Sequence, residues 1–170
     1  MGWSMTAAHG VKLAYPDRPV ISFTGDGDFM MTMQELSTAA QYQLPVITAV
    51  MNNSGWMAIK ALQLASFGDK SFTFANDFTN LDGSRYLVDY VKLAESMGVT
   101  AWRVTKLEEV KPAIQRALHQ KGPVLIDFII SNEFPYGDGD STGWWDMPVP
   151  AYIPGGMREE YLKGVAQEFI

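Results

Sequence analysis

Apolar and polar residues form blocks along the chain that predict strands and helices in turn. Four short apolar runs predict strands, at residues 20–24, 46–51, 100–104 and 124–130. Between them, apolar residues recur three or four positions apart, which is the spacing of one helix face. We expect helices at residues 3–13, 32–43, 58–65, 88–97, 107–120 and 158–169. This alternation predicts an α/β fold, namely a doubly wound, mostly parallel sheet with helices on both faces.

Turn-forming residues mark where these elements end. Tyr15-Pro16-Asp17-Arg18 reads as a turn with proline at its second position, and Gly98 is the expected stop of the helix before it. Residues 67–84 are rich in Gly, Asp, Asn, Ser and Thr and predict a loop. Residues 131–156 are irregular, with many Pro, Gly and Trp. We therefore divide the chain into an α/β domain at 1–132 and a tail with a final helix at 133–170.

The composition indicates a globular protein and excludes several classes of function. The chain has 170 residues, of which 47% are hydrophobic and 19% are charged. A net charge of −6 and an isoelectric point near 4.8 argue against a nucleic-acid or anionic-membrane surface. There is no cysteine, which rules out disulfides, thiolate chemistry and cysteine-based zinc sites. Without a secretory signal or an apolar run of about 18 residues, a cytoplasmic protein is the expectation.

Two polar turns carry the chemistry. Gly25-Asp26-Gly27-Asp28 follows the first predicted strand, and Asn52-Asn53 follows the second, with Asn53 placed 27 residues after Asp26. A crossover helix brings the carboxyl ends of two parallel strands to one sheet edge, where open α/β sheets bind ligands. Carboxylate and carboxamide oxygens suit Mg²⁺. Glycine lets N–H groups approach a phosphate, and a following helix start favours an anion. The alternative is a helix cap at Asp26 and an ordinary turn at Asn53.

The two motifs and their flanks resemble those of thiamine-diphosphate (ThDP) enzymes. The cofactor domain of the acetolactate synthase and pyruvate oxidase family is similar in the spacing from GDG to NN and in the surrounding sequence. The matching stretches are Met1-Gly2-Trp3, Ala14-Tyr15-Pro16-Asp17-Arg18, Met31-Thr32-Met33-Gln34-Glu35-Leu36, Gln41-Tyr42-Gln43-Leu44-Pro45-Val46 and Pro123-Val124-Leu125-Ile126-Asp127. The resemblance implies a ThDP-binding C-terminal domain.

The resemblance also implies a set of site residues. It places Mg²⁺ on Asp26, Asn53 and the main-chain carbonyl of Gly55. The cofactor-binding residues it implies are Met1, Gly25, Asp26, Gly27, Asp28, Asn53, Gly55, Trp56, Met57 and Ile59. Asp28 departs from the relatives, which often carry Gly, Ser or Ala, so its side chain must point away from the diphosphate. Met1 would prop the bent cofactor, or else be a frayed terminus. Trp56, Met57 and Ile59 would face the thiazolium, or else pack within a helix.

The implied function is the cofactor-binding part of an enzyme that cleaves or forms C–C bonds next to a carbonyl. A 2-oxo acid decarboxylase or carboligase is the leading interpretation. Three alternatives stay open: a cyclic-dione C–C hydrolase, the β-type subunit of a two-chain decarboxylase, and a non-catalytic ThDP-fold domain. The substrate and any flavin (FAD) would depend on domains upstream of this sequence.

No residue of the chain matches the family's activating glutamate, which lies on a separate pyrimidine-binding domain. We therefore expect no catalytic residue here, weak ThDP binding and no turnover by the chain alone. The expected partner is a domain or subunit carrying that glutamate, within a homo- or hetero-oligomer. In the family this domain begins with a further strand and helix before the position of Met1, so a fragment or a subunit of a split enzyme is expected.

The tail is unusually aromatic between residues 141 and 152. In the family resembled, the C-terminal segment often folds over the active site, and a lid here would exclude water. The alternative is an oligomer contact made by Trp144, Trp145 and Tyr152.

Overall fold

The structure is a computed structural model that describes residues 1–67, 75–132, 149–152 and 157–167. The chain divides into two compact units, each described by itself. The first consists of Met1–Gly55 and Thr79–Asn132, and the second of Trp56–Phe78 and Glu133–Ile170. Within the described residues, no helix is both long enough and apolar enough to cross a membrane.

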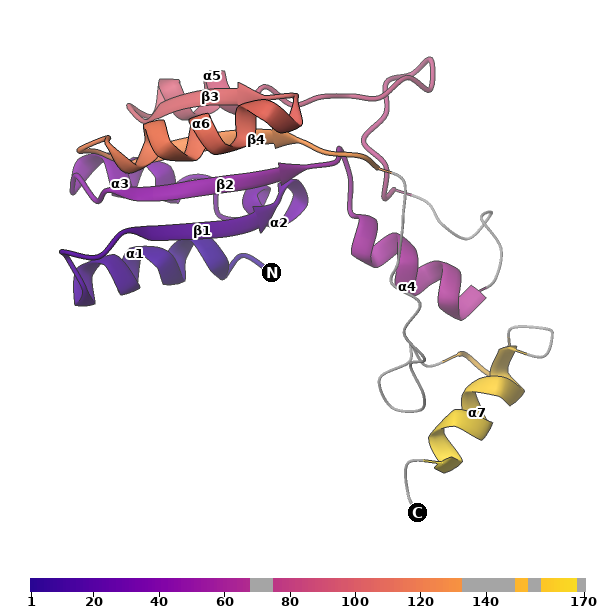
Figure 1. Cartoon of the computed structure of the whole chain (residues 1–170). Coiled ribbons are helices and arrows are strands. Elements are labelled where there is room, and N and C mark those ends of the chain that lie inside the picture. Colours follow the sequence, from indigo (N-terminus) through magenta and orange to yellow (C-terminus); the bar gives the residue numbers. More distant parts are fainter. Residues whose placement is uncertain (68–74, 133–148, 153–156, 168–170) are drawn as a thin grey trace. The chain divides into compact units, whose positions relative to one another are not determined.

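A parallel four-stranded sheet forms the first unit. Its strands are β1 (Val20–Gly25), β2 (Val46–Asn52), β3 (Thr100–Val104) and β4 (Val124–Ile129). They lie in the order β1-β2-β4-β3, and all three pairs are parallel, so their carboxyl ends share one edge (Figure 1). This confirms the predicted α/β fold, because each predicted strand is present within one residue at either end.

One face of the sheet packs against helices from both halves of the first unit. These are α1 (Ser4–Ala14), α2 (Asp26–Met30), α3 (Glu35–Gln41) and α5 (Tyr90–Ser96). Met5, Phe29, Leu36, Tyr90 and Ala94 form a buried cluster with strand residues Val50 and Leu125. Alternate residues of a strand point to opposite faces, so this cluster fixes which strand positions look towards these helices.

The other face packs against α6 (Leu107–Leu118). Ala113 and Ala117 join Ile47, Ala49 and Ile126 in a second buried cluster. This cover does not extend over β1 within the described residues: its burial alternates strictly, and Phe23 is 62% exposed. The sheet is thus covered on both faces over its centre and on one face at β1.

Two predicted elements need correction. The single helix expected at 32–43 is shorter, because α3 ends at Gln41 and Gln43 has a left-handed φ of 50°. The short helix α2 was read only as a phosphate loop. The predicted stops are confirmed elsewhere: Arg18 N–H donates to the Tyr15 carbonyl, and Gly98 has a φ of 79°.

The second unit contains α4 (Met57–Phe67) and α7 (Met157–Gln167). Trp56 N–H donates to the Asn76 carbonyl at 2.7 Å, and the Trp56 ring meets Phe78 edge-on. Lys60 Nζ lies 2.6 Å from Asp77 Oδ2. Trp144 and Trp145 of the tail lie outside the described residues, so the lid and oligomer-contact interpretations both stay predictions.

Candidate functional site

The carboxyl ends of β1 and β2 bring the GDG and NN motifs together. Asp26 directly follows β1 and is 1% exposed. Its Oδ1 accepts the Gly27 N–H at 3.0 Å, and its Oδ2 accepts the Gly55 N–H at 3.1 Å. The second bond spans 29 residues and joins the two loops. The side chain of Asp26 is therefore held in one orientation between the two strand ends.

The burial of Asp26 sets its electrostatics. Desolvation raises the pKa of the Asp26 carboxyl above its ordinary value of 3.8, and the N–H groups of Gly27 and Gly55 offset only part of this effect. A charged carboxylate here is thus short of positive partners. Such a group is suited to meet a cation, which would supply the missing compensation.

The Asn53 carboxamide faces two oxygens. One of its terminal atoms lies 3.0 Å from the Gly55 carbonyl oxygen and 3.2 Å from Asp26 Oδ1. With nitrogen in that place, the amide donates to both. With oxygen there, three oxygens converge, and only a cation stabilises that arrangement. Mg²⁺ with ligands at about 2.1 Å in an octahedron separates adjacent oxygens by about 3.0 Å. The distances from Asn53 to the other two oxygens therefore match those between adjacent ligands of a magnesium ion.

Gly25 leaves space at the same edge. Its φ of −70° is ordinary for any residue, and a Cβ built on it would meet no atom within 4 Å. Neither backbone conformation nor packing within the described chain requires glycine here. A ligand that approaches the backbone closely would require it. The position fits the diphosphate-binding role expected for the loop.

Asp28 turns towards the start of α1. Its carboxylate accepts hydrogen bonds from the Gly2 N–H, from Thr24 Oγ1 at 2.9 Å and from Ser4 Oγ at 3.3 Å. The Met1 ammonium group lies 3.9 Å from Asp28 Oδ1. Asp28 therefore anchors the first residues of the chain beside the GDG loop, and these donors occupy its side chain.

The remaining predicted residues divide between the two units. Met1 is in the first unit and its side chain is exposed. Trp56, Met57 and Ile59 open the second unit, where Met57 is buried and Trp56 contacts Phe78. The first unit thus brings together Gly25, Asp26, Gly27, Asn53 and Gly55, with Asp28 and Met1 beside them.

Sequence reasoning missed a buried polar group behind this site. Asp127, on β4, is 0% exposed and accepts from Asn52 Nδ2 at 2.9 Å and from Arg103 Nε at 2.8 Å. The available signal was an acidic residue within an apolar strand. Arg85 was missed as well. Its guanidinium donates to the carbonyls of Asn52 and Ile130, at the ends of β2 and β4.

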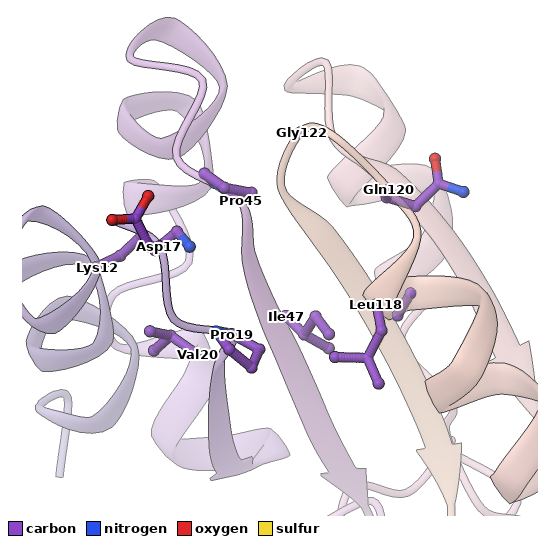
Figure 2. A pocket seen from close by; sticks show the side chains of 10 residues that line it. Lys12, Asp17, Pro19, Val20, Pro45, Ile47, Leu118, Gln120 and Gly122 are labelled. Atoms are coloured by element: carbon purple, nitrogen blue, oxygen red, sulfur yellow. The ribbon is translucent and has the colours of Figure 1, made fainter. Parts of the chain in front are cut away.

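A hollow in the first unit lies away from these residues. It has a volume of about 340 Å³ and is lined by Pro19, Val20, Pro45 and Ile47 together with the end of α6 (Figure 2). These residues precede or begin β1 and β2. The hollow is therefore at the amino edge of the sheet, opposite the GDG loop, and plays no part in the site.

Residues 1–128 match the family of the thiamine pyrophosphate enzyme C-terminal TPP binding domain. The chain belongs to this family. Among its relatives is an acetolactate synthase large subunit of Corynebacterium glutamicum, 40% identical over 78% of this chain and 21% of that protein. A 3D-(3,5/4)-trihydroxycyclohexane-1,2-dione hydrolase of Halalkalibacterium halodurans is 36% identical over 88% of this chain and 23% of that protein.

A solved structure supports the same assignment. The thiamine diphosphate-dependent 4-hydroxybenzoylformate decarboxylase of Rhodococcus jostii RHA1 superposes with a TM-score of 0.68 and 31% identity. The match covers 80% of this chain and 24% of that one. The chain thus spans about a quarter of the length of its relatives. The family and the TPP-binding domain confirm the predicted resemblance and the ThDP cofactor.

Proposed function

We propose that the first unit holds the diphosphate of ThDP through Mg²⁺ bound by Asp26, Asn53 and the Gly55 carbonyl. The observation that carries this proposal is the set of three oxygen positions, with Asn53 only 3.0 and 3.2 Å from the other two. The open space at Gly25 supports it, because it leaves room for a ligand against the loop.

Electrostatics explains why a metal is needed. The cofactor diphosphate is anionic, the chain carries a net charge of −6, and the buried Asp26 would repel phosphate directly. A divalent cation placed between the Asp26 carboxylate and the diphosphate attracts both groups. The N–H groups of the glycine loop then need only orient the diphosphate. Asp28 and Met1 would border the loop.

The reaction class follows from the cofactor and the relatives. ThDP supplies a carbanion and an electron sink for chemistry next to a carbonyl. The chain's own residues bind and orient it. We assign the whole enzyme to the carboligases and decarboxylases of 2-oxo acids, as a lyase or transferase. Cyclic-dione hydrolysis is the second candidate, because a dione hydrolase is among the relatives.

Calorimetric titration of the chain with ThDP, with and without Mg²⁺, tests the cofactor site. Asp26→Ala should remove the Mg²⁺-dependent part of binding, whereas Asp17→Ala, an exposed acid at the other sheet edge, should leave it unchanged. Binding that does not depend on Mg²⁺ in the unmodified chain would contradict the metal assignment.

Turnover is a separate question. The activating glutamate is expected on a pyrimidine-binding domain or subunit, in an oligomer with this chain. We therefore expect the purified chain to release no CO₂ from pyruvate in the presence of ThDP and Mg²⁺. Robust decarboxylation would show that a group within the chain replaces that glutamate.

A further inference from the structure

A line of polar groups, buried except for Arg103, runs across three strands of the sheet and ends at the loop that holds Asn53 and Gly55. Arg103 on β3 lies opposite Asp127 on β4 in the strand register. Its Nε donates to Asp127 Oδ2 at 2.8 Å, and the other oxygen of Asp127 accepts from Asn52 Nδ2 at 2.9 Å. Asn52 closes β2, directly before Asn53.

The line fixes the orientation of the Asn52 amide. Because a carboxylate can only accept, the amide must present its nitrogen to Asp127. Its oxygen then faces the loop, where Oδ1 accepts the Ser54 N–H at 3.2 Å and lies 3.5 Å from Ser54 Oγ. All of these groups except Arg103 are buried, so a reversed amide would leave a buried donor facing a donor.

Ser54 needs this support. Its φ of 57° lies in the left-handed region, which is unfavourable for a residue with a Cβ. The turn at Ser54 lies between Asn53 and Gly55. The Asn53 carboxamide is 3.2 Å from Asp26 Oδ1 and 3.0 Å from the Gly55 carbonyl oxygen. The orientation of two of the three proposed ligands thus depends on a turn that Asn52 holds.

Placing an acid at a buried strand position costs free energy of desolvation. Asp127 lies between Ile126 and Phe128 in a strand that is otherwise apolar. An apolar residue would pack there without the cost of desolvating an ion pair. A carboxylate at this position does something an apolar residue cannot, which is to dictate the direction of an amide.

We propose that Asp127 is a positioning residue for the metal site: it orients the Asn52 amide, which holds the Ser54 turn and thereby aims Asn53 and Gly55 at the cation. This inference rests on the proposed function. It assigns roles to the first asparagine of the NN pair and to the acid of the last strand.

Exchanging the side chains of Asn52 and Asp127, singly and together, tests the inference. In Asp127→Asn, Arg103 still requires an oxygen from residue 127, so the new amide turns its nitrogen towards Asn52. Asn52 must then reverse and present its own nitrogen to the Ser54 N–H. In Asn52→Asp, two carboxylates meet about 2.9 Å apart.

In the double exchange, Asn52→Asp with Asp127→Asn, every hydrogen-bond donor again faces an acceptor. The amide at 127 gives its oxygen to Arg103 and its nitrogen to the acid at 52, and that acid accepts the Ser54 N–H. Recovery in the double variant would not be expected if each residue acted independently.

The measurement is the apparent dissociation constant for Mg²⁺ at fixed ThDP, by calorimetry on the full chain, beside ThDP binding in EDTA and the free energy of unfolding in urea. We expect each single variant to weaken Mg²⁺ binding about 10–100-fold, as partners behind metal ligands commonly do. ThDP binding in EDTA should stay unchanged, and the double variant should return close to the original value.

Asp89→Asn is the matched control. Asp89 Oδ1 lies 3.7 Å from Arg103, at the exposed end of the same line, and its loss should not affect Mg²⁺ binding. If Asp127→Asn does not fold, Asn52→Ala tests the same inference, because it leaves the Asp127–Arg103 pair intact. Its Mg²⁺ binding should weaken with ThDP binding in EDTA unchanged.

Two outcomes would overturn the inference while leaving the proposed function standing. One is unchanged Mg²⁺ binding in folded single variants. The other is a double variant whose Mg²⁺ binding is weakened by as much as the losses of the two single variants added together. If the unmodified chain shows no Mg²⁺-dependent ThDP binding, the proposed function itself has failed, and the inference fails with it.

Discussion

The buried Asp26 is the acid of the proposed metal site, and burial disfavours the charged form of its carboxyl in the metal-free fold. Desolvation raises the pKa of its carboxyl above 3.8, so the folded chain binds a proton there more tightly than the unfolded chain. The stability contributed by the protonated form is fully present below pH 3.8 and is lost as pH rises through the raised pKa.

We therefore predict that ionisation of Asp26 lowers the stability of the metal-free chain as pH rises above 3.8. The His9 imidazole opposes this effect, because burial lowers its pKa below 6.5 and the folded chain gains stability as pH rises towards 6.5. The lowered pKa values of Asp82 and Asp89 add stability as pH rises towards 3.8. The measurement is therefore the difference in the free energy of unfolding between the chain and Asp26→Asn, from urea unfolding in EDTA at a series of pH values. The chain should lose stability relative to Asp26→Asn as pH rises, and a difference that does not change with pH would exclude Asp26 as its source.

Asp28 is predicted to act on stability. Asp28→Ala removes the acceptor of the Gly2 N–H, Thr24 Oγ1 and Ser4 Oγ, and we expect a loss of about 1–2 kcal/mol in the free energy of unfolding. Urea denaturation measures it, with the exposed Asp17→Ala as control. Equal stabilities for the two variants would mean that these bonds are replaced by water.

The site residues that could be predicted from the sequence are those that belong to a short motif. Glycines beside an acid, and a pair of asparagines after a strand, indicate ligand chemistry from spacing alone. The hydrogen bond between Asn52 and Asp127 is marked by no such motif, because it spans 75 residues and depends on strand order and register. The structure was needed to show that β4 lies next to β2.

At the scale of elements, the central strands contribute most of the core. Leu125 on β4 is 0% exposed and packs between the helices of one face, whereas Leu107 at the start of α6 is 86% exposed. We predict that Leu125→Ala lowers the free energy of unfolding by about 2–5 kcal/mol. Leu107→Ala should change it by less than about 0.5 kcal/mol. Urea denaturation compares the two, and similar losses would contradict this view of the core.

Strands were predicted more closely than helices, and the reason is physical. A parallel strand covered on both faces is nearly all apolar and stops at polar residues, as β2 and β4 do. The segment 26–43 instead contains α2, a turn and α3, all with apolar residues at helical spacing. Periodicity does not reveal a break between two short helices that face the same core.

At the scale of the molecule, the buried clusters all lie between Met5 and Phe128, within the first unit. We predict that a chain ending at residue 132 folds with the same far-UV spectrum and a cooperative urea transition. It should also keep the Mg²⁺-dependent ThDP binding, since the proposed ligands lie in the first unit. A collapsed or aggregated product would show that the tail contributes to the core.

The architecture and family could be predicted from the sequence because the GDG-to-NN spacing and the strand pattern are both local. The structure confirms the parallel sheet, and the family assignment confirms the cofactor. Substrate choice could not be predicted in this way, because an acetolactate synthase and a dione hydrolase match this chain at similar identity.

The Asn53 carboxamide, finally, offers a spectroscopic signal for occupancy of the proposed metal site. We predict that its two terminal atoms exchange places when a cation binds, since nitrogen suits the neighbouring acceptors and oxygen suits the metal. In a ¹⁵N-labelled sample, the side-chain NH₂ resonances of this one residue should therefore move when Mg²⁺ and ThDP bind. Occupancy could then be followed spectroscopically, without an activity assay.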